Sequence, residues 1–108
     1  MLNAILEFLR KVWNAVKKFF VRLFDYVNHI LGFFTAPERK DLFRDPDNLA
    51  VVVRRKLDGG KYQMIDCGFS KSRCTVVDVQ DVQVITADKL DAKTTELFGE
   101  MDMLVVSH

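Results

Sequence analysis

The first 31 residues carry the pattern that most restricts how this chain can fold. Apolar side chains recur there three or four positions apart, which is the spacing of one face of an α-helix. They stand at positions 2, 5, 6, 9, 12, 13, 16, 19, 20, 23, 24, 27, 30 and 31. The pattern predicts one amphipathic helix within residues 1–34, about 45 Å long. Gly32 and Pro37 are the expected stop signals.

Charge divides the chain near residue 35. Residues 1–34 hold five of the 16 basic and two of the 15 acidic side chains, a net charge of +3. That leaves 11 basic and 13 acidic side chains, a net charge of −2, for residues 35–108. The whole chain of 108 residues carries +1, so no global field favours nucleic acid or an acidic partner. The length corresponds to one domain, which excludes a multidomain enzyme and an eight-unit β/α barrel.

A charged connector, residues 35–48, lies between the helical pattern and a region of different periodicity. Residues 49–57 are rich in β-branched side chains and predict a strand. Asp58-Gly59-Gly60 then predicts a hairpin, because glycine supplies the positive φ angles that a tight turn requires.

The rest of the chain reads as short strands and one short helix. The residues expected to face inward are odd-numbered up to Val79 and even-numbered from Val82 onward. A regular strand cannot change faces in this way, so a bulge or turn is required at Gln80–Asp81. Residues 86–98 predict a loop and then a helix capped by Asp88 or Asp91 and ended by Gly99. Further strands are expected at 61–69, 73–79 and 101–106. The prediction is an α+β protein: an N-terminal helix (1–34), a connector (35–48) and a β-rich domain (49–108). That domain is a mainly antiparallel sheet or partly open barrel of four or five strands, with a short helix before the last one.

Cys67 and Cys74 are the only cysteines, too few for a disulfide scaffold or for a four-ligand zinc site. A turn centred on Ser70 and Lys71 would make them cross-strand neighbours, either as reduced core residues or as a disulfide in an oxidising compartment. They lack CxxC spacing and a nearby histidine, so we expect no metal and no cofactor.

The sequence contains few residues that could act as catalytic groups. Nucleophilic mechanisms need a base, and the two histidines are His29, on the polar side of the predicted helix, and His108, the last residue. Asp66, Asp78 and Asp81 fit the exposed face of an antiparallel sheet, and strand alternation points Asp66 away from the core. The sequence therefore predicts a protein that is not an enzyme.

The apolar face of the predicted helix exceeds what the β-rich domain can cover. Each large side chain left in water forgoes about 1.5–3 kcal/mol of burial, and a helix about 45 Å long overhangs strands of about 20 Å. We therefore expect a homo-oligomeric interaction module that self-associates through this face and presents the β-domain as a binding surface. The residues expected on the face are Leu9, Val12, Trp13, Val16, Phe19, Phe20, Leu23, Phe24 and Val27.

Two alternatives remain for that face and for the sheet. A peripheral membrane protein is the first, because interfacial helices combine Trp and Phe with a basic polar side. A nucleic-acid-binding β-module is the second, although the sheet offers only Tyr62 and Phe69 for base stacking, so nucleic acid is not the expected partner. No secretory signal or transmembrane run is evident, so we expect a cytoplasmic protein, with the inner face of a membrane as the alternative location. The sequence indicates no small-molecule ligand.

Overall fold

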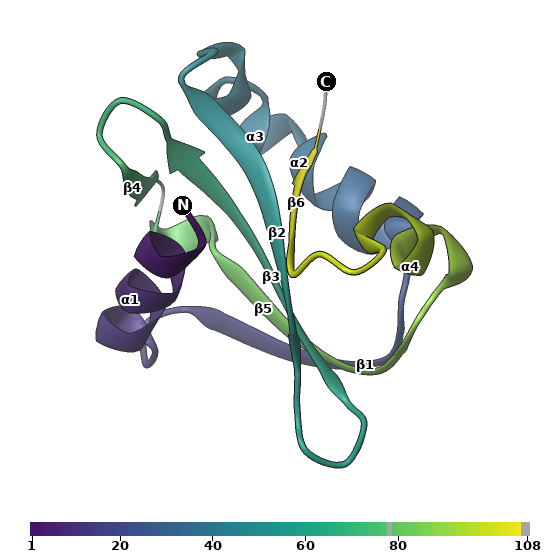
Figure 1. Cartoon of the computed structure of the whole chain (residues 1–108). Helices are drawn as coiled ribbons and strands as arrows, with labels where there is room; N and C mark the ends of the chain where they lie inside the picture. The colour runs from purple at the N-terminus through teal and green to yellow at the C-terminus, as the bar shows by residue number, and fades with distance from the viewer. Residues whose placement is uncertain (78, 107–108) are drawn as a thin grey trace.

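One open, mixed sheet forms the centre of the protein, as the computed structural model in Figure 1 shows; it describes residues 1–77 and 79–106. The strand order is β1-β5-β3-β2-β6, and β4 pairs with β3 off this path. β1 runs parallel to β5, and the other pairs are antiparallel. The strands are β1 (Lys17–Phe24), β2 (Asn48–Lys56), β3 (Tyr62–Ser70), β4 (Thr75–Val77), β5 (Gln83–Leu90) and β6 (Met103–Val106).

Short helices connect and cover these strands. The connector predicted at 35–48 contains two of them. The helical elements are α1 (Leu2–Val12), the π-helical η1 (Tyr26–Leu31), α2 (Gly32–Phe34), α3 (Pro37–Lys40), the 3₁₀ turns η2 (Leu42–Arg44) and η3 (Val79–Asp81), and α4 (Ala92–Phe98). The α+β class, an amphipathic N-terminal helix, an open sheet and a short helix before the last strand are confirmed.

The length of the N-terminal helix is a correction. The helix ends at Val12, residues 13–16 turn the chain, and Lys17–Phe24 is a strand. Half of this strand is Phe or Val, residue types that favour a pleated, half-buried surface. It pairs with β5 over its whole length, from Lys17 opposite Gln83 to Phe24 opposite Leu90. β5 in turn includes residues 86–90, which were expected to be a loop.

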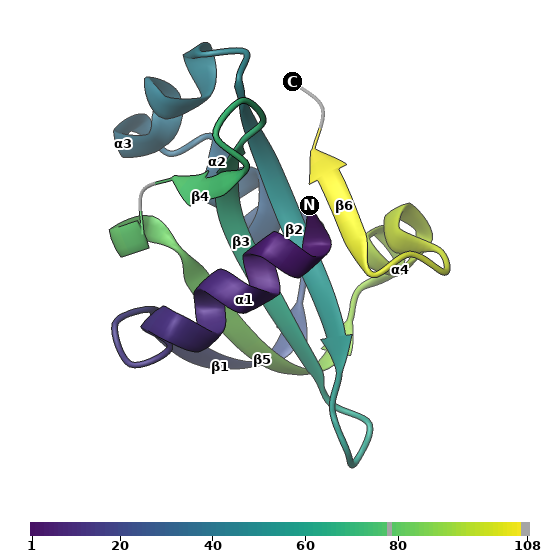
Figure 2. The same cartoon turned by 60° about the vertical axis from the view of Figure 1, so that its left-hand side comes forward.

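The central strands β2 and β3 are buried on both faces, and α1 lies across one of these faces (Figure 2). The α1-side cluster joins Ile5 and Leu9 of α1 to Val51, Val53 and alternate residues of the neighbouring strands. The cluster on the opposite face joins Ala50, Val52, Met64 and Ile85 to apolar side chains of η1, α2 and α4. Because both faces are covered, the central strands β2 and β3 are apolar on both sides rather than alternating.

Local turn and cap chemistry follows the predictions. Gly59 and Gly60 adopt φ of 86° and 84° in the β2–β3 hairpin, where the Leu57 N–H donates to the Lys61 carbonyl at 2.8 Å. The Asp91 side chain caps α4 by accepting from the Thr94 N–H at 3.0 Å, and α4 ends at Gly99. The parity change before Val82 is made by the turn η3. Asp78 and His108 lie outside the described residues.

The two cysteines are not cross-strand neighbours, contrary to expectation. Ser70 pairs with Thr75, so the whole of residues 71–74 is turn. Cys67 is buried opposite Val51, whereas Cys74 is exposed in the turn with a positive φ of 52°. The turn is longer than predicted because Asp47 accepts hydrogen bonds from the hydroxyls of Ser70 and Ser72, which hold its backbone open.

Candidate functional site

The nine residues predicted to form one apolar face occupy three different environments. Their positions follow from the change of the chain from helix to strand after residue 16. Leu9, Val16 and Phe24 are buried, Val12 and Trp13 are half-buried, and Phe19, Phe20, Leu23 and Val27 are exposed.

The part of the face that lies on α1 is covered by the chain itself. Ile5 and Leu9 are 0% and 3% exposed in the α1-side cluster, and Val12 and Trp13 pack against it. A helix of 11 residues is about 16 Å long and does not overhang the strands. The expectation that the helix itself needs an external cover is therefore wrong.

The uncovered part lies on β1 and the first turn of η1, and we call Phe19, Phe20, Leu23 and Val27 the β1 surface. Their exposed fractions are 45%, 80%, 44% and 64%. β1 is the outermost strand of its side of the sheet, so its free edge pairs with no other strand among residues 1–77 and 79–106 (Figure 1). Exposed aromatic side chains and unpaired backbone groups therefore coincide on one element.

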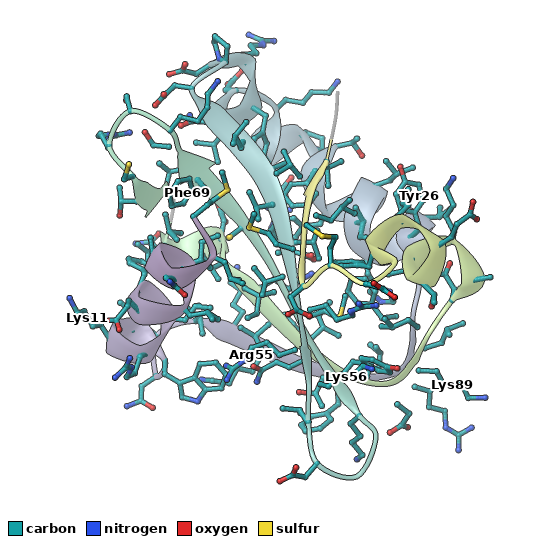
Figure 3. All side chains as sticks on the ribbon, viewed as in Figure 1. Lys11, Tyr26, Arg55, Lys56, Phe69 and Lys89 are labelled. Atoms are coloured by element: carbon teal, nitrogen blue, oxygen red, sulfur yellow. The ribbon has the colours of Figure 1, made fainter. Side chains whose placement is uncertain are left out.

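Basic side chains frame this surface. Lys17, Lys18 and Arg22 belong to β1, and none of them forms an ion pair within the described part of the chain. The Lys18 Nζ lies 5.0 Å from the centre of the Trp13 ring, a cation–π contact. Figure 3 labels Lys89 of β5, the strand that pairs with β1, and also Lys11 of α1 and Arg55 and Lys56 of β2, which are not on the strand next to β1. Lys89 stands opposite Leu23 in the sheet register.

A cavity of about 420 Å³ lies behind β1, on the face opposite α1. Phe19 and Val21 of β1 and Gln83 and Ile85 of β5 contribute from the sheet. Opposite them, η1, α2 and α3 contribute Asn28, His29, Gly32, Phe33, Glu38 and Arg39. The lining thus combines aromatic and apolar side chains with five polar ones, Asn28, His29, Glu38, Arg39 and Gln83.

A buried acid stands behind this cavity. Asp66 is fully buried, which corrects the expectation that it points to solvent; the second face of the sheet is covered by η1 and α2, so no exposed face exists there. Gln83 Nε2 donates to its Oδ2 at 3.1 Å, and its Oδ1 has no hydrogen-bond partner in the described structure. Burial raises the pKa of Asp66 well above its usual range, and the Gln83 hydrogen bond and the charge of Arg39 only partly oppose this. The buried side chain therefore favours the neutral acid.

Arg39 is anchored beside the same cavity. Its guanidinium stacks 3.8 Å from the centre of the Phe33 ring, and its Nη1 donates to the Phe33 carbonyl at 3.1 Å. Glu38 Oε1 lies 3.5 Å from Nη1 but is mostly exposed. The contacts to Phe33 hold Arg39 in place as part of the wall.

Among residues 1–77 and 79–106, the structure does not bring His29 and Cys67 together. His29 is half-buried, stacks on Phe24 at 5.1 Å and accepts from the Asp25 N–H through Nδ1 at 2.9 Å. Cys67 lies in the α1-side cluster, on the other face of the sheet from Phe24. Burial raises the pKa of the Cys67 thiol to about 12, with the nearby Asp66 charge as a second cause. A thiol of this kind is a poor nucleophile near neutral pH.

Sequence reasoning missed two features of this region. Asp66 was placed on a solvent face because one covered face was assumed, and the uninterrupted run Val51-Val52-Val53 was the signal that both faces are covered. The four cavity-lining residues of η1 and α2 were assigned to a long helix.

Within residues 1–77 and 79–106, no group of three His, Cys, Asp or Glu side chains is placed to hold a metal ion, and no helix has the length and apolarity to cross a bilayer. No protein-family model, curated protein or solved structure matches this chain.

Proposed function

We propose that the protein is a non-enzymatic interaction module that self-associates through the β1 surface. The observation that carries this proposal is Phe20, which is 80% exposed at the middle of an edge strand. Covering a side chain of this size is worth about 1.5–3 kcal/mol. Phe19 and Leu23 add two exposed apolar side chains on the other face of the same strand.

A second copy of the chain could cover Phe19, Phe20 and Leu23, which are exposed within one chain. The helix that was expected to associate is already buried, which leaves β1 as the element where exposed aromatic side chains and a free backbone edge occur together. A twofold interface brings the same patch from both copies into contact, so an apolar patch supplies its own complement.

Sedimentation velocity over a concentration series tests this proposal. We expect the wild-type protein to shift from monomer to a larger species with concentration, and Phe20→Lys to weaken the association by about 100-fold or more, because a cation would be buried in the interface. Val105→Lys is the matched control, since Val105 is a 42% exposed apolar residue on β6, the strand at the opposite end of the sheet. Monomers at all concentrations, or equal effects of the two substitutions, would contradict the proposal.

Attachment to an anionic membrane surface is a second candidate, favoured by Lys17, Lys18 and Arg22. These three cations carry no ion pair in the described structure and flank the most exposed aromatic side chain. Each basic side chain near an anionic bilayer contributes about 1 kcal/mol. Co-sedimentation with phosphatidylserine vesicles distinguishes the candidates: a monomer that binds these vesicles but not phosphatidylcholine vesicles supports the membrane function, and an oligomer that ignores both supports self-association.

A further inference from the structure

The hydrogen bonds at the end of β1 define which of its backbone groups face outward. The Asp91 N–H donates to the Phe24 carbonyl at 2.9 Å, which continues the parallel ladder beyond the Phe24–Leu90 pair. In a parallel ladder one residue directs both its N–H and its C=O to the neighbouring strand, and the next residue directs both away. The register with β5 has no slip, so the odd-numbered residues Lys17, Phe19, Val21 and Leu23 present their backbone groups to the free edge.

We infer that two copies pair β1 with β1 in antiparallel orientation, around a twofold axis at Val21. This inference rests on the proposed self-association and specifies how it occurs. A twofold axis perpendicular to the sheet leaves each side chain on the same face of the joined sheet in both copies. Paired residues must therefore point to the same face, which requires that one residue at the axis is paired with the same residue of the other copy. The choice is therefore among a few discrete registers.

Charge excludes the neighbouring registers. An axis at Phe20 would place Lys18 directly opposite Arg22 twice, and an axis at Arg22 would place the two arginines opposite each other. Like charges directly opposed across an antiparallel pair are destabilising. An axis at Leu23 would require pairing through η1, which is helical from Tyr26 onward. An axis at Phe19 would pair residues 17–21 of the strand and leave Arg22, Leu23 and Phe24 unpaired, whereas the Val21 axis pairs residues 18–24.

The Val21 register separates the three cations of β1 from one another and brings exposed apolar side chains together. Phe19 faces Leu23 of the partner subunit, which joins two exposed apolar side chains on one face. Phe20 faces Arg22 of the partner subunit on the other face, a cation–π arrangement.

At the ends of the same register, Lys17 faces Asp25 of the partner subunit, so opposite charges meet. Lysines on an edge strand usually discourage pairing. In this chain they instead restrict the register, because the axes at Phe20 and Arg22 set cations opposite each other, whereas the Val21 axis sets none opposite another and pairs residues 18–24 of the strand.

The paired strands would join the two sheets into one, with both cavities on the same face of it. Phe19 and Val21 line the cavity and belong to the odd-numbered set that meets the partner. Leu23 of the partner subunit would therefore lie beside the mouth of the cavity, so dimer formation changes what the mouth presents.

Engineered disulfides test the register in the full-length chain. Cys74→Ser removes the exposed native thiol, and Cys67 is buried. In that background, Val21→Cys places two thiols directly across the axis with Cα atoms about 5.5 Å apart, a common disulfide separation. Phe20→Cys is the matched control, because the register separates its two copies by two residues along the strand, about 8 Å or more.

We expect Val21→Cys to form a disulfide-linked dimer under mild oxidation at least about tenfold faster than Phe20→Cys, although Phe20 is the more exposed position. A mixture of Phe19→Cys and Leu23→Cys chains should cross-link, while each alone should not. If the protein is dimeric by sedimentation but Phe20→Cys cross-links as fast as Val21→Cys, the register is wrong and the proposed function stands. If no variant and no wild-type sample is dimeric, both fail. Circular dichroism of each variant confirms that it is folded.

Discussion

α1 and β1 arise from one continuous apolar pattern, yet the apolar side chains of α1 are buried and most of those of β1 are exposed. In α1, Ile5 and Leu9 are almost completely buried against the sheet. In β1, Phe19, Phe20 and Leu23 are exposed at the edge of the same sheet. The spacing of apolar residues thus indicates that they gather on a side of the chain, but long-range pairing decides which element they form and what covers them.

The largest expected effect comes from shortening a side chain on the covered element. Ile5→Ala should lower the free energy of unfolding by about 2–5 kcal/mol, because it leaves a cavity between α1 and the sheet. Phe20→Ala, measured at concentrations where the monomer dominates, should change it by less than about 0.5 kcal/mol. Urea unfolding of the two variants measures the difference. Similar losses would show that Phe20 is covered within the monomer.

A smaller effect is expected where the end of β1 is fixed to the rest of the fold. Asp91 accepts from the Thr94 N–H at 3.0 Å and from the Tyr26 N–H at 3.2 Å, so it joins α4 to η1. Asp91→Ala should cost about 0.5–2 kcal/mol, as for other helix caps. Asp88→Ala, which removes an exposed ion pair with Lys61 at 3.7 Å, is the matched control and should cost less than about 1 kcal/mol.

The Asp91 effect should also depend on pH in a defined direction. Partial burial acts to raise the pKa of Asp91, but the hydrogen bonds from Thr94 and Tyr26 outweigh it, so the pKa lies below its usual value. The ionised group therefore stabilises the fold above the ordinary aspartate pKa, and this contribution is lost as the pH falls through the lowered pKa. A difference between wild type and Asp91→Ala that persists undiminished in strong acid would contradict this assignment.

A pH effect of the opposite sign is expected for Asp66 in the covered part of the sheet. Because burial raises the pKa of Asp66, the folded state holds a proton that the unfolded chain releases, so stability falls as the pH rises above the ordinary aspartate pKa. Asp66→Asn still accepts from Gln83 and should lack this fall. Asp58→Asn, at the exposed hairpin turn, controls for the loss of a carboxylate. Parallel pH profiles of unfolding for wild type and Asp66→Asn would show that the group does not titrate as described.

Features set by short-range chemistry could be predicted from the sequence. The Asp58-Gly59-Gly60 hairpin, a helix cap at Asp88 or Asp91 and the Gly99 stop depend on residues within one turn of each other. The structure has the hairpin and the stop, and of the two cap candidates it has Asp91. The extent of the first helix could not be predicted, because Lys17–Phe24 fits helical spacing and becomes a strand only by pairing with β5. The burial of Asp66 likewise depends on η1 and α2, which cover a face that strand alternation alone leaves open.

The parallel pairing of β1 with β5 has a consequence for how the chain acquires its structure during synthesis. Lys17 leaves the ribosome long before Gln83, its partner 66 positions further on. At translation rates of about 5–20 residues per second, the phenylalanine-rich segment waits roughly 3–13 seconds for the strand that completes it. During that interval the nascent chain carries Phe19, Phe20 and Phe24 before the strand that pairs with them has been made.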